Sequence, residues 1–326
     1  MPRTHIILGA ALLATVATLS VTALAHAQAN YPQRQVRIVV PFPAGGPSDV
    51  QARLIAIKLQ ERLGQPFVVE NRGGAGGNIG TQAAARTEPD GYSLLFMTPA
   101  QVINMTLYAR PGYDLKTDFV PIGLVSTAPA ILVAHPSLGA KNLEELFAAV
   151  RAKPGVAFAS AGPGLSTHLM MEQIKTLANL DMLHVPYRGS APALNGLLAG
   201  DVMMLMDSIV SSLPHVRSGA LRGIAVSSMK SSPVAPEVPT LAESGLPGFD
   251  ALTWYGLMAP AKTPDHIVKK LAAEINKVLD LPEVRERFLT MGSDPNVLDP
   301  AAFAKFLDEE AVRWDSVAKA SGAKAE

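Results

Sequence analysis

The chain contains no cysteine, which excludes thiol catalysis and cysteine-bound zinc. It also has no net charge, because 28 lysine and arginine residues balance 28 aspartate and glutamate residues. Charge therefore gives no reason to expect nucleic acid or a membrane surface as a partner. Aromatic residues make up only 6% of the 326 residues, but hydrophobic residues make up 48%. This composition is typical of a globular protein with one large or two ordinary domains.

The longest hydrophobic run stands at the N-terminus. Arg3 precedes a mostly apolar stretch over 6–24, and Ala25-His26-Ala27 has the small residues of a cleavage site. A membrane anchor is the alternative, because the stretch is nearly long enough to span a bilayer. Its threonine and serine residues argue against an anchor. We therefore expect 1–27 to be a signal peptide cleaved after Ala27, and the mature protein to be soluble and exported.

Short apolar runs and helical patterns alternate along the rest of the chain, which predicts an α/β fold with parallel sheets covered by helices. Strands are expected over 36–40, 66–69, 94–97, 130–133, 156–159, 183–185, 202–206, 221–226 and 251–258. Helices are expected from Ser48 to Gly64 and over 81–86, 143–152, 167–177, 193–198, 266–279, 283–290 and 301–317. Ser48 is a candidate N-cap, and Gly64 stands where the first of these helices should stop.

Two glycine-bearing loops each follow a predicted strand and open a predicted helix. The first is PFPAGGPSD over 41–49, and the second is SAGPGLSTH over 160–168. The first turn of a helix leaves backbone N–H groups without partners and carries partial positive charge, and glycine lets a ligand approach closely. Two such loops suggest that a small anion is held from two sides. Such loops also arise for backbone reasons alone, so both interpretations stay open.

Other chemical motifs are not completed in this sequence. The glycine run over 73–80 lacks the lysine of a phosphate loop and the spacing of a dinucleotide fingerprint, and it is interpreted as a tight turn before a helix. Ser166 and His168 are too close in sequence to face each other from one helix, and no G-x-S-x-G motif surrounds them. The histidines have no metal-ligand spacing, so no metal site is expected.

Three polar residues need separate interpretation, and two of them keep more than one. His184, inside an apolar strand, is expected to be a hydrogen-bonded core residue. His168 either packs locally in the first turn of its helix or contacts a ligand. Asp207 is either a helix N-cap or a polar contact in a cleft.

Several strings together resemble the Bug family, the periplasmic receptors of tripartite tricarboxylate transporters. The resemblance begins with VPFPAGGPSDV over 40–50. It continues with VENRGGAGGNIG over 69–80, PDGY over 89–92, HVPYRGSAPAL over 184–194, PTLAESG over 239–245 and WYG over 254–256. It covers essentially the whole mature chain.

The resemblance implies a two-lobed periplasmic-binding-protein fold of the Venus flytrap kind, with a ligand cleft between the lobes. Each lobe would be a mostly parallel sheet flanked by helices. Lobe 1 would comprise 31–128 plus 257–326, and lobe 2 would comprise 129–256. The chain would cross between the lobes twice, near Ala128 and near Gly256.

The resemblance also implies carboxylate recognition, through water held by the Ala44-Gly45 loop and through amides and hydroxyls at 166–168. Candidate ligand-binding residues are Phe42, Ala44, Gly45, Ser48, Asp49, Thr98, Gln101, Gly162, Gly164, Ser166, Thr167, His168, Arg188 and Asp207. Arg188 is the candidate charge partner for an anion. Leu165 stands where relatives commonly have serine or threonine. That exchange removes a hydroxyl and makes the expected pocket more apolar.

The expected function is that of a solute receptor, not an enzyme, with no cofactor and as a monomer. Its ligand would be a dicarboxylate, a tricarboxylate, an amino acid or an aromatic acid, and its partners would be integral-membrane transporter subunits. Two alternatives remain. One is a secreted hydrolase or lyase on a small acid that uses Ser166, His168 or Asp207. The other is a ligand sensor with a membrane signalling partner.

Overall fold

The computed structural model describes residues 31–321, so the expected signal peptide lies outside the described residues. The strands are β1 Val36–Val40, β2 Phe67–Asn71, β3 Ser93–Met97, β4 Phe119–Ala134, β5 Val156–Ser160, β6 Met182–Pro186, β7 Met204–Ser208, β8 Arg222–Val226, β9 Leu252–Pro260 and β10 Asp294–Leu298. The helices are α2 Pro47–Leu63, α3 Asn78–Ala85, α4 Pro99–Leu107, α5 Leu115–Asp118, α6 Leu143–Ala152, α7 Ser166–Leu177, α8 Ser190–Ala199, α9 Ile209–Arg217, α10 Asp265–Leu279, α11 Pro282–Thr290 and α12 Pro300–Ser321. Short 3₁₀ turns cover η1 Ala75–Gly77 and η2 Pro136–Leu138.

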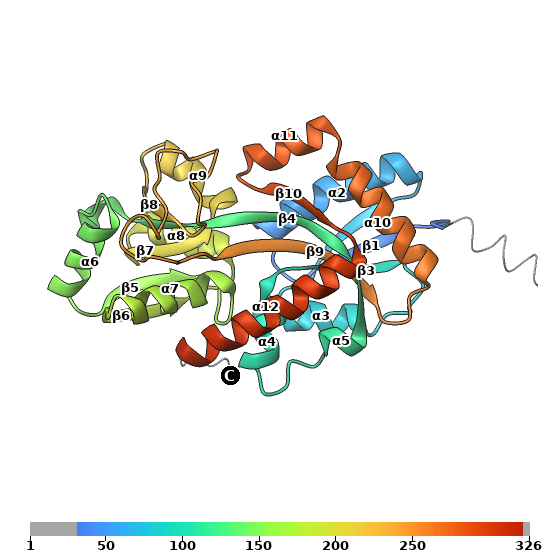
Figure 1. Cartoon of the computed structure of the whole chain (residues 1–326), viewed down its shortest axis with the longest axis horizontal. Helices are drawn as coiled ribbons and strands as arrows, with labels where there is room; N and C mark the ends of the chain where they lie inside the picture. The colour runs from blue at the N-terminus through green and yellow to red at the C-terminus, as the bar shows by residue number, and fades with distance from the viewer. Residues whose placement is uncertain (1–30, 322–326) are drawn as a thin grey trace, which may run out of the picture.

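The two halves of the molecule are joined through β4, a strand of 16 residues. Its first part, up to Pro129, pairs with β9, and its last part, from Ala130, pairs with β7 and β8. β4 and β9 both run between the two halves in Figure 1. The parallel strands β2-β1-β3 extend one sheet beyond β9, and β7-β5-β6 extend the other beyond β4. The two-lobed α/β fold is thus confirmed, with mixed sheets.

The parallel strands bring a set of helix N-termini together between the sheets. β1 and β3 in one sheet lead into α2 and α4, and β5, β6 and β7 in the other lead into α7, α8 and α9. Ligands in open α/β sheets bind beyond the carboxyl ends of the strands, where such helices begin. The topology therefore directs attention to the space between these five helices.

The first part of β4 was not expected to be a strand, because Pro121, Gly123 and Pro129 disfavour one. Its pairing with β9 has register shifts between Pro121 and Gly123 and between Leu124 and Ser126, so irregular pairing accommodates Pro121 and Gly123. Pro129 stands where β4 changes from β9 to β7 as its partner. The expected N-cap role of Ser48 is wrong. Helix α2 begins at Pro47, and Gly46 is its N-cap. Proline at the first helical position loses no hydrogen bond, so the N-cap lies two residues earlier than expected.

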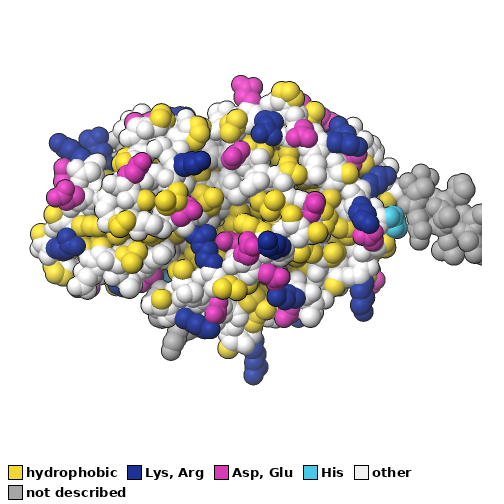
Figure 2. All heavy atoms as spheres, in the orientation of Figure 1, with side chains coloured by type: hydrophobic (Ala, Val, Ile, Leu, Met, Phe, Trp, Pro, Cys, Tyr) yellow, Lys and Arg dark blue, Asp and Glu magenta, His cyan; other side chains and the backbone are white. Residues whose placement is uncertain are grey.

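Helix α12 crosses the front of the molecule in Figure 1 and packs against α4 of one half and α7 of the other. Phe303 and Trp314 of α12 are fully buried, in the same hydrophobic cluster as Leu169 of α7. On the face in Figure 2, positive and negative side chains are interspersed over the surface. Within residues 31–321, no helix combines the length and the hydrophobicity that crossing a bilayer requires.

Gly256 of β9 is needed for the close approach of α12. A Cβ atom at this position would collide with the ring of Phe303. We expect Gly256→Ala to lower the free energy of unfolding by about 1–3 kcal/mol, because the ring has to move in a densely packed core. Urea denaturation measures the change.

The double variant Gly256→Ala/Phe303→Leu is the control. The smaller leucine makes room for the added methyl group. Gly256→Ala should therefore cost less stability when it is added to Phe303→Leu than when it is added to the unaltered protein. Equal stability of Gly256→Ala and the unaltered protein would contradict the proposed contact.

Candidate functional site

A cavity of about 310 Å³ lies between the two sheets. Loops from both lobes approach each other beside it. A Cβ atom at Gly189 would lie 3.5 Å from Cγ of Pro43, and one at Gly164 would lie 2.9 Å from Cδ1 of Leu107. The two walls of the cavity are therefore close together in this structure. Its lining is Phe42, Pro43, Ala44, Gly46, Pro47, Ser48, Thr98, Pro99, Ala100, Ala161, Leu165, Ser166, Thr167, Gly189, Ser190, Ala191, Pro192, Asp207, Ser208, Thr253, Trp254 and Tyr255.

Five helices begin at the cavity wall, and four of them have no side-chain cap. The N-caps of α2, α7, α8 and α9 are Gly46, Leu165, Gly189 and Ser208, and none accepts a hydrogen bond from the first turn through its side chain. Only α4 is capped, by Thr98 together with Gln101. Uncapped N-termini leave N–H donors and partial positive charge at the cavity. The site is therefore suited to an anion.

Asp207 is the only ionisable carboxyl group among the described residues that line the cavity. Its oxygens accept hydrogen bonds from the hydroxyls of Ser190 at 2.6 Å, Ser211 at 2.8 Å and Ser212 at 2.8 Å. Burial raises the pKa of this carboxyl group, although the hydroxyls act to lower it. Of the two interpretations from sequence, the N-cap is wrong, because Ser208 occupies the N-cap position of α9, and Asp207 instead lies in the cavity wall.

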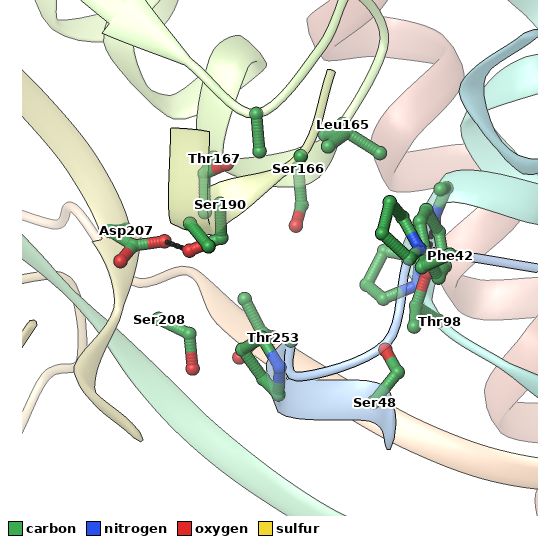
Figure 3. Close-up of a pocket in the computed structure, with 18 of the residues that line it drawn as sticks. Phe42, Ser48, Thr98, Leu165, Ser166, Thr167, Ser190, Asp207, Ser208 and Thr253 are labelled. Carbon is green, nitrogen blue, oxygen red and sulfur yellow. Dashed lines mark hydrogen bonds between the residues drawn. The ribbon is translucent and has the colours of Figure 1, made fainter. Parts of the chain in front are cut away.

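Figure 3 shows how the side chains face the cavity. Ser166 and Thr167 of α7 point into it from one lobe, and Ser48 of α2 points into it from the other. The sequence-derived candidates that line the cavity are Phe42, Ala44, Ser48, Thr98, Ser166, Thr167 and Asp207. The candidates outside the lining are Gly45, Asp49, Gln101, Gly162, Gly164, His168 and Arg188.

Some of the candidates outside the lining hold the lining residues in place. The carboxylate of Asp49 accepts a hydrogen bond from the Gly45 N–H at 2.9 Å and pairs with Arg53, also at 2.9 Å. Burial acts to raise the pKa of Asp49, but Arg53 and the Gly45 N–H hold it below its ordinary value. Gln101 accepts from the Thr98 N–H at 2.8 Å. These bonds fix the loop before α2 and the first turn of α4.

His168 and Arg188 do not reach the cavity. His168 Nδ1 accepts the Gly164 N–H at 3.2 Å, and Nε2 lies 3.7 Å from Glu172, which is the local packing considered from sequence. No hydrogen bond joins Ser166 to His168 within the described chain, so the pair lacks the contact that nucleophilic catalysis requires. Arg188 is exposed.

Sequence reasoning missed much of the cavity wall. The residues that it did not single out as ligand contacts include Gly189, Ser190, Ser208, Thr253, Trp254 and Tyr255. Gly189-Ser190 repeats the signal of the two glycine-bearing loops, since it follows a strand and opens a helix. Thr253 to Tyr255 lie on β9, and only the three-dimensional pairing of β9 with β4 brings them to the cavity.

Behind the second loop, three rings form a stack. The ring centroids of His168 and His184 are 4.0 Å apart, and those of His184 and Phe158 are 5.0 Å apart. His184 Nε2 lies 2.6 Å from the hydroxyl of buried Ser160, which also accepts the Gly162 N–H at 3.2 Å. His184 is thus a hydrogen-bonded packing residue, as the sequence indicated. In the described part of the chain, no group of three or more acidic or histidine side chains is arranged to hold a metal ion.

The fold and the cavity between its lobes define a solute-binding protein of the two-lobed periplasmic class. The chain belongs to the TctC family, whose model is described as "Tripartite tricarboxylate transporter family receptor" and matches residues 51–323. This is a family of substrate-binding receptors and not of enzymes.

Known proteins of the same kind are similar over nearly the whole chain. Protein BugT of Bordetella pertussis is 40% identical over 314 residues, which are 95% of each chain. The structure of R. palustris Rpa4515 with adipate is 35% identical, has a TM-score of 0.87 and covers 90% of this chain and 99% of its own. MatC from Rhodopseudomonas palustris with bound malate is 34% identical, with a TM-score of 0.82, over 88% of this chain and 99% of its own.

The stack of His168, His184 and Phe158 predicts that the free energy of unfolding depends on pH. Burial, and then the neighbouring charge of His168, lowers the pKa of His184 from 6.5 to about 4. The unfolded chain therefore binds more protons than the folded chain between these two values. We expect the contribution of His184 to the free energy of unfolding to be complete above pH 6.5 and to be lost as the pH drops toward 4. The full shift corresponds to about 3 kcal/mol, and solvent screening of the partly exposed ring reduces the expected loss to about 2 kcal/mol.

Urea denaturation at pH 7, 5.5 and 4 measures this loss. His184→Gln should lessen it, and the same exchange at exposed His266 serves as the control. An NMR titration that finds His184 protonated at pH 6 would refute the assignment.

Proposed function

We propose that this protein is a periplasmic receptor that captures a small carboxylated molecule in the cavity between its lobes and delivers it to a tripartite inner-membrane transporter. The observation that carries the proposal is the meeting of uncapped helix N-termini from both lobes at one cavity. Backbone N–H groups at such ends bind carboxylates through charge-assisted hydrogen bonds. The structural relatives with adipate and malate support this choice of ligand class.

The proposed contacts come from both lobes. The amides in the first turns of α2 and α7 would donate to the carboxylate, and the hydroxyls of Ser48, Ser166 and Thr167 would add further hydrogen bonds. Phe42, Ala44 and Thr98 would contact the rest of the ligand. Gly45, Asp49, Gln101, Gly162, Gly164 and His168 would act behind this layer by holding the loops.

We propose that the lobes close on the ligand about the strands that join them. The change of partners in β4 at Pro129 and Ala130 supports a first crossing close to the expected boundary at 128. β9 pairs with β4 from Leu252 onward, which favours a second crossing slightly before the expected boundary at 256. A ligand that contacts both lobes stabilises the closed arrangement relative to the open one.

The delivery step rests on the family to which the chain belongs. The TctC model is named for tripartite tricarboxylate transporters, so we propose integral-membrane subunits of such a transporter as partners and a monomeric receptor in the periplasm. The signal peptide expected over 1–27 supports this location. Ligand-dependent capture of the receptor by the transporter subunits, reconstituted in vesicles, tests delivery separately from binding.

A negative charge at the start of α7 tests the cavity assignment. We expect Thr167→Asp to lower carboxylate affinity at least tenfold, because like charges repel strongly in a partly buried site. A thermal-shift screen of mono-, di- and tricarboxylates first identifies an acid that binds. Calorimetric titration of that acid then compares the variants.

Leu177→Asp places the same charge on the same helix, at a side chain that is 59% exposed. This control should bind as the unaltered protein does. Equal affinity of Thr167→Asp and Leu177→Asp would place the carboxylate elsewhere.

A further inference from the structure

We infer that the cavity prefers an acid with one carboxylate and an uncharged, apolar body to a dicarboxylate, and that Leu165 is a residue that sets this preference. The inference rests on the proposed function, because it narrows the ligand class of the same cavity. It follows from the charge, the shape and the hydrogen-bond donors of the lining.

The described lining has no cationic side chain that could pair with a second carboxylate. Among the described residues that line the cavity there is no lysine, arginine or histidine, and Asp207 is the only ionisable acid. In Figure 3, Asp207 lies on the side of the cavity away from Ser48 and Phe42. A second carboxylate that extended toward it would meet a like charge in a buried site without a counter-ion, which is unfavourable.

Several polar side chains of the lining already donate their hydrogen atoms to acceptors within the protein. The Trp254 indole donates to Glu310 at 2.5 Å, so its ring presents carbon to the ligand. The Thr253 hydroxyl donates to the Ala128 carbonyl at 2.9 Å, and the Ser190 hydroxyl donates to Asp207. These groups therefore cannot act as donors to a second carboxylate unless they give up their present bonds.

Leu165 brings an apolar side chain to the start of α7. As the N-cap it has no side-chain hydrogen bond with the first turn, and it lies in the lining together with Phe42, Pro43 and Trp254. The amides of α7 thus stay free for one carboxylate, while the side chain beside them favours a hydrocarbon body.

Two acids with the same carbon skeleton separate the effect of the second charge from that of size. Hexanoate and adipate both have six carbons, and only adipate has a carboxylate at each end. We expect calorimetric titration of the unaltered protein to show hexanoate binding at least tenfold more tightly than adipate, which corresponds to about 1.4 kcal/mol. Benzoate and malate form a second pair, in which we expect benzoate to bind more tightly.

Leu165→Ala and Leu165→Ser then test the role of the side chain. Both remove nearly the same volume, but only serine adds a hydroxyl. We expect either variant to lower hexanoate affinity by about threefold to tenfold through lost apolar contact. Leu165→Ser should in addition reduce the preference for hexanoate over adipate more than Leu165→Ala does, because the hydroxyl can donate to the second carboxylate. Thermal unfolding without ligand checks that both variants fold.

The outcomes distinguish the two proposals. If adipate or malate binds more tightly than both monocarboxylates, or if the hexanoate-to-adipate ratio is the same in all three proteins, the inference is wrong while the receptor proposal stands. If no acid from a panel of mono-, di- and tricarboxylates binds, carboxylate capture itself is wrong. Should the serine variant fail to fold, the affinities of the unaltered protein and of Leu165→Ala decide between these results.

Discussion

The pairing of β4 with strands of both sheets is the interaction on which the rest of the molecule depends. One continuous strand hydrogen-bonds to β9 in its first part and to β7 in its last part, so the two sheets are held end to end. The carboxyl ends of the parallel strands in both lobes then face the same space. Helices that follow these strands must begin there, and their unpaired N–H groups collect at one cavity. The binding chemistry is thus a consequence of the connection between the lobes.

The cavity combines strong local polarity with a lack of cationic side chains. Positive potential comes from backbone dipoles that are fixed by the fold, and the described lining contains no lysine or arginine. Fixed dipoles need no reorganisation when an anion arrives, and they cost no side-chain entropy to position. Asp207, held by three serine hydroxyls, offsets part of the same potential at α8 and α9. Such a site can discriminate between ligands by their number of charges.

Much of the fold was accessible from sequence, and the reasons for the exceptions are physical. The α6 helix was expected at its observed bounds, and the structure shows why they are sharp: Asn142 caps its start, and its apolar residues lie on one buried face. The first part of β4 was missed, because prolines and a glycine in a strand are tolerated only where the pairing is irregular. In the cavity, the loops before α2 and α7 were found from their glycines. Thr253 and Trp254 were missed, because their place depends on strand pairing.

The two tryptophans of the chain share one buried carboxylate, and this gives the protein a built-in optical probe. Trp254 and Trp314 donate to the same oxygen of Glu310 at 2.5 and 2.7 Å, but only Trp254 is part of the cavity wall. Since the chain has 2 tryptophans in all, every change in its indole emission on filling the cavity comes from this pair. Trp314 does not line the cavity and is joined to Trp254 through the shared Glu310 oxygen. Binding of a ligand in the cavity can therefore be followed by tryptophan fluorescence, without an attached dye.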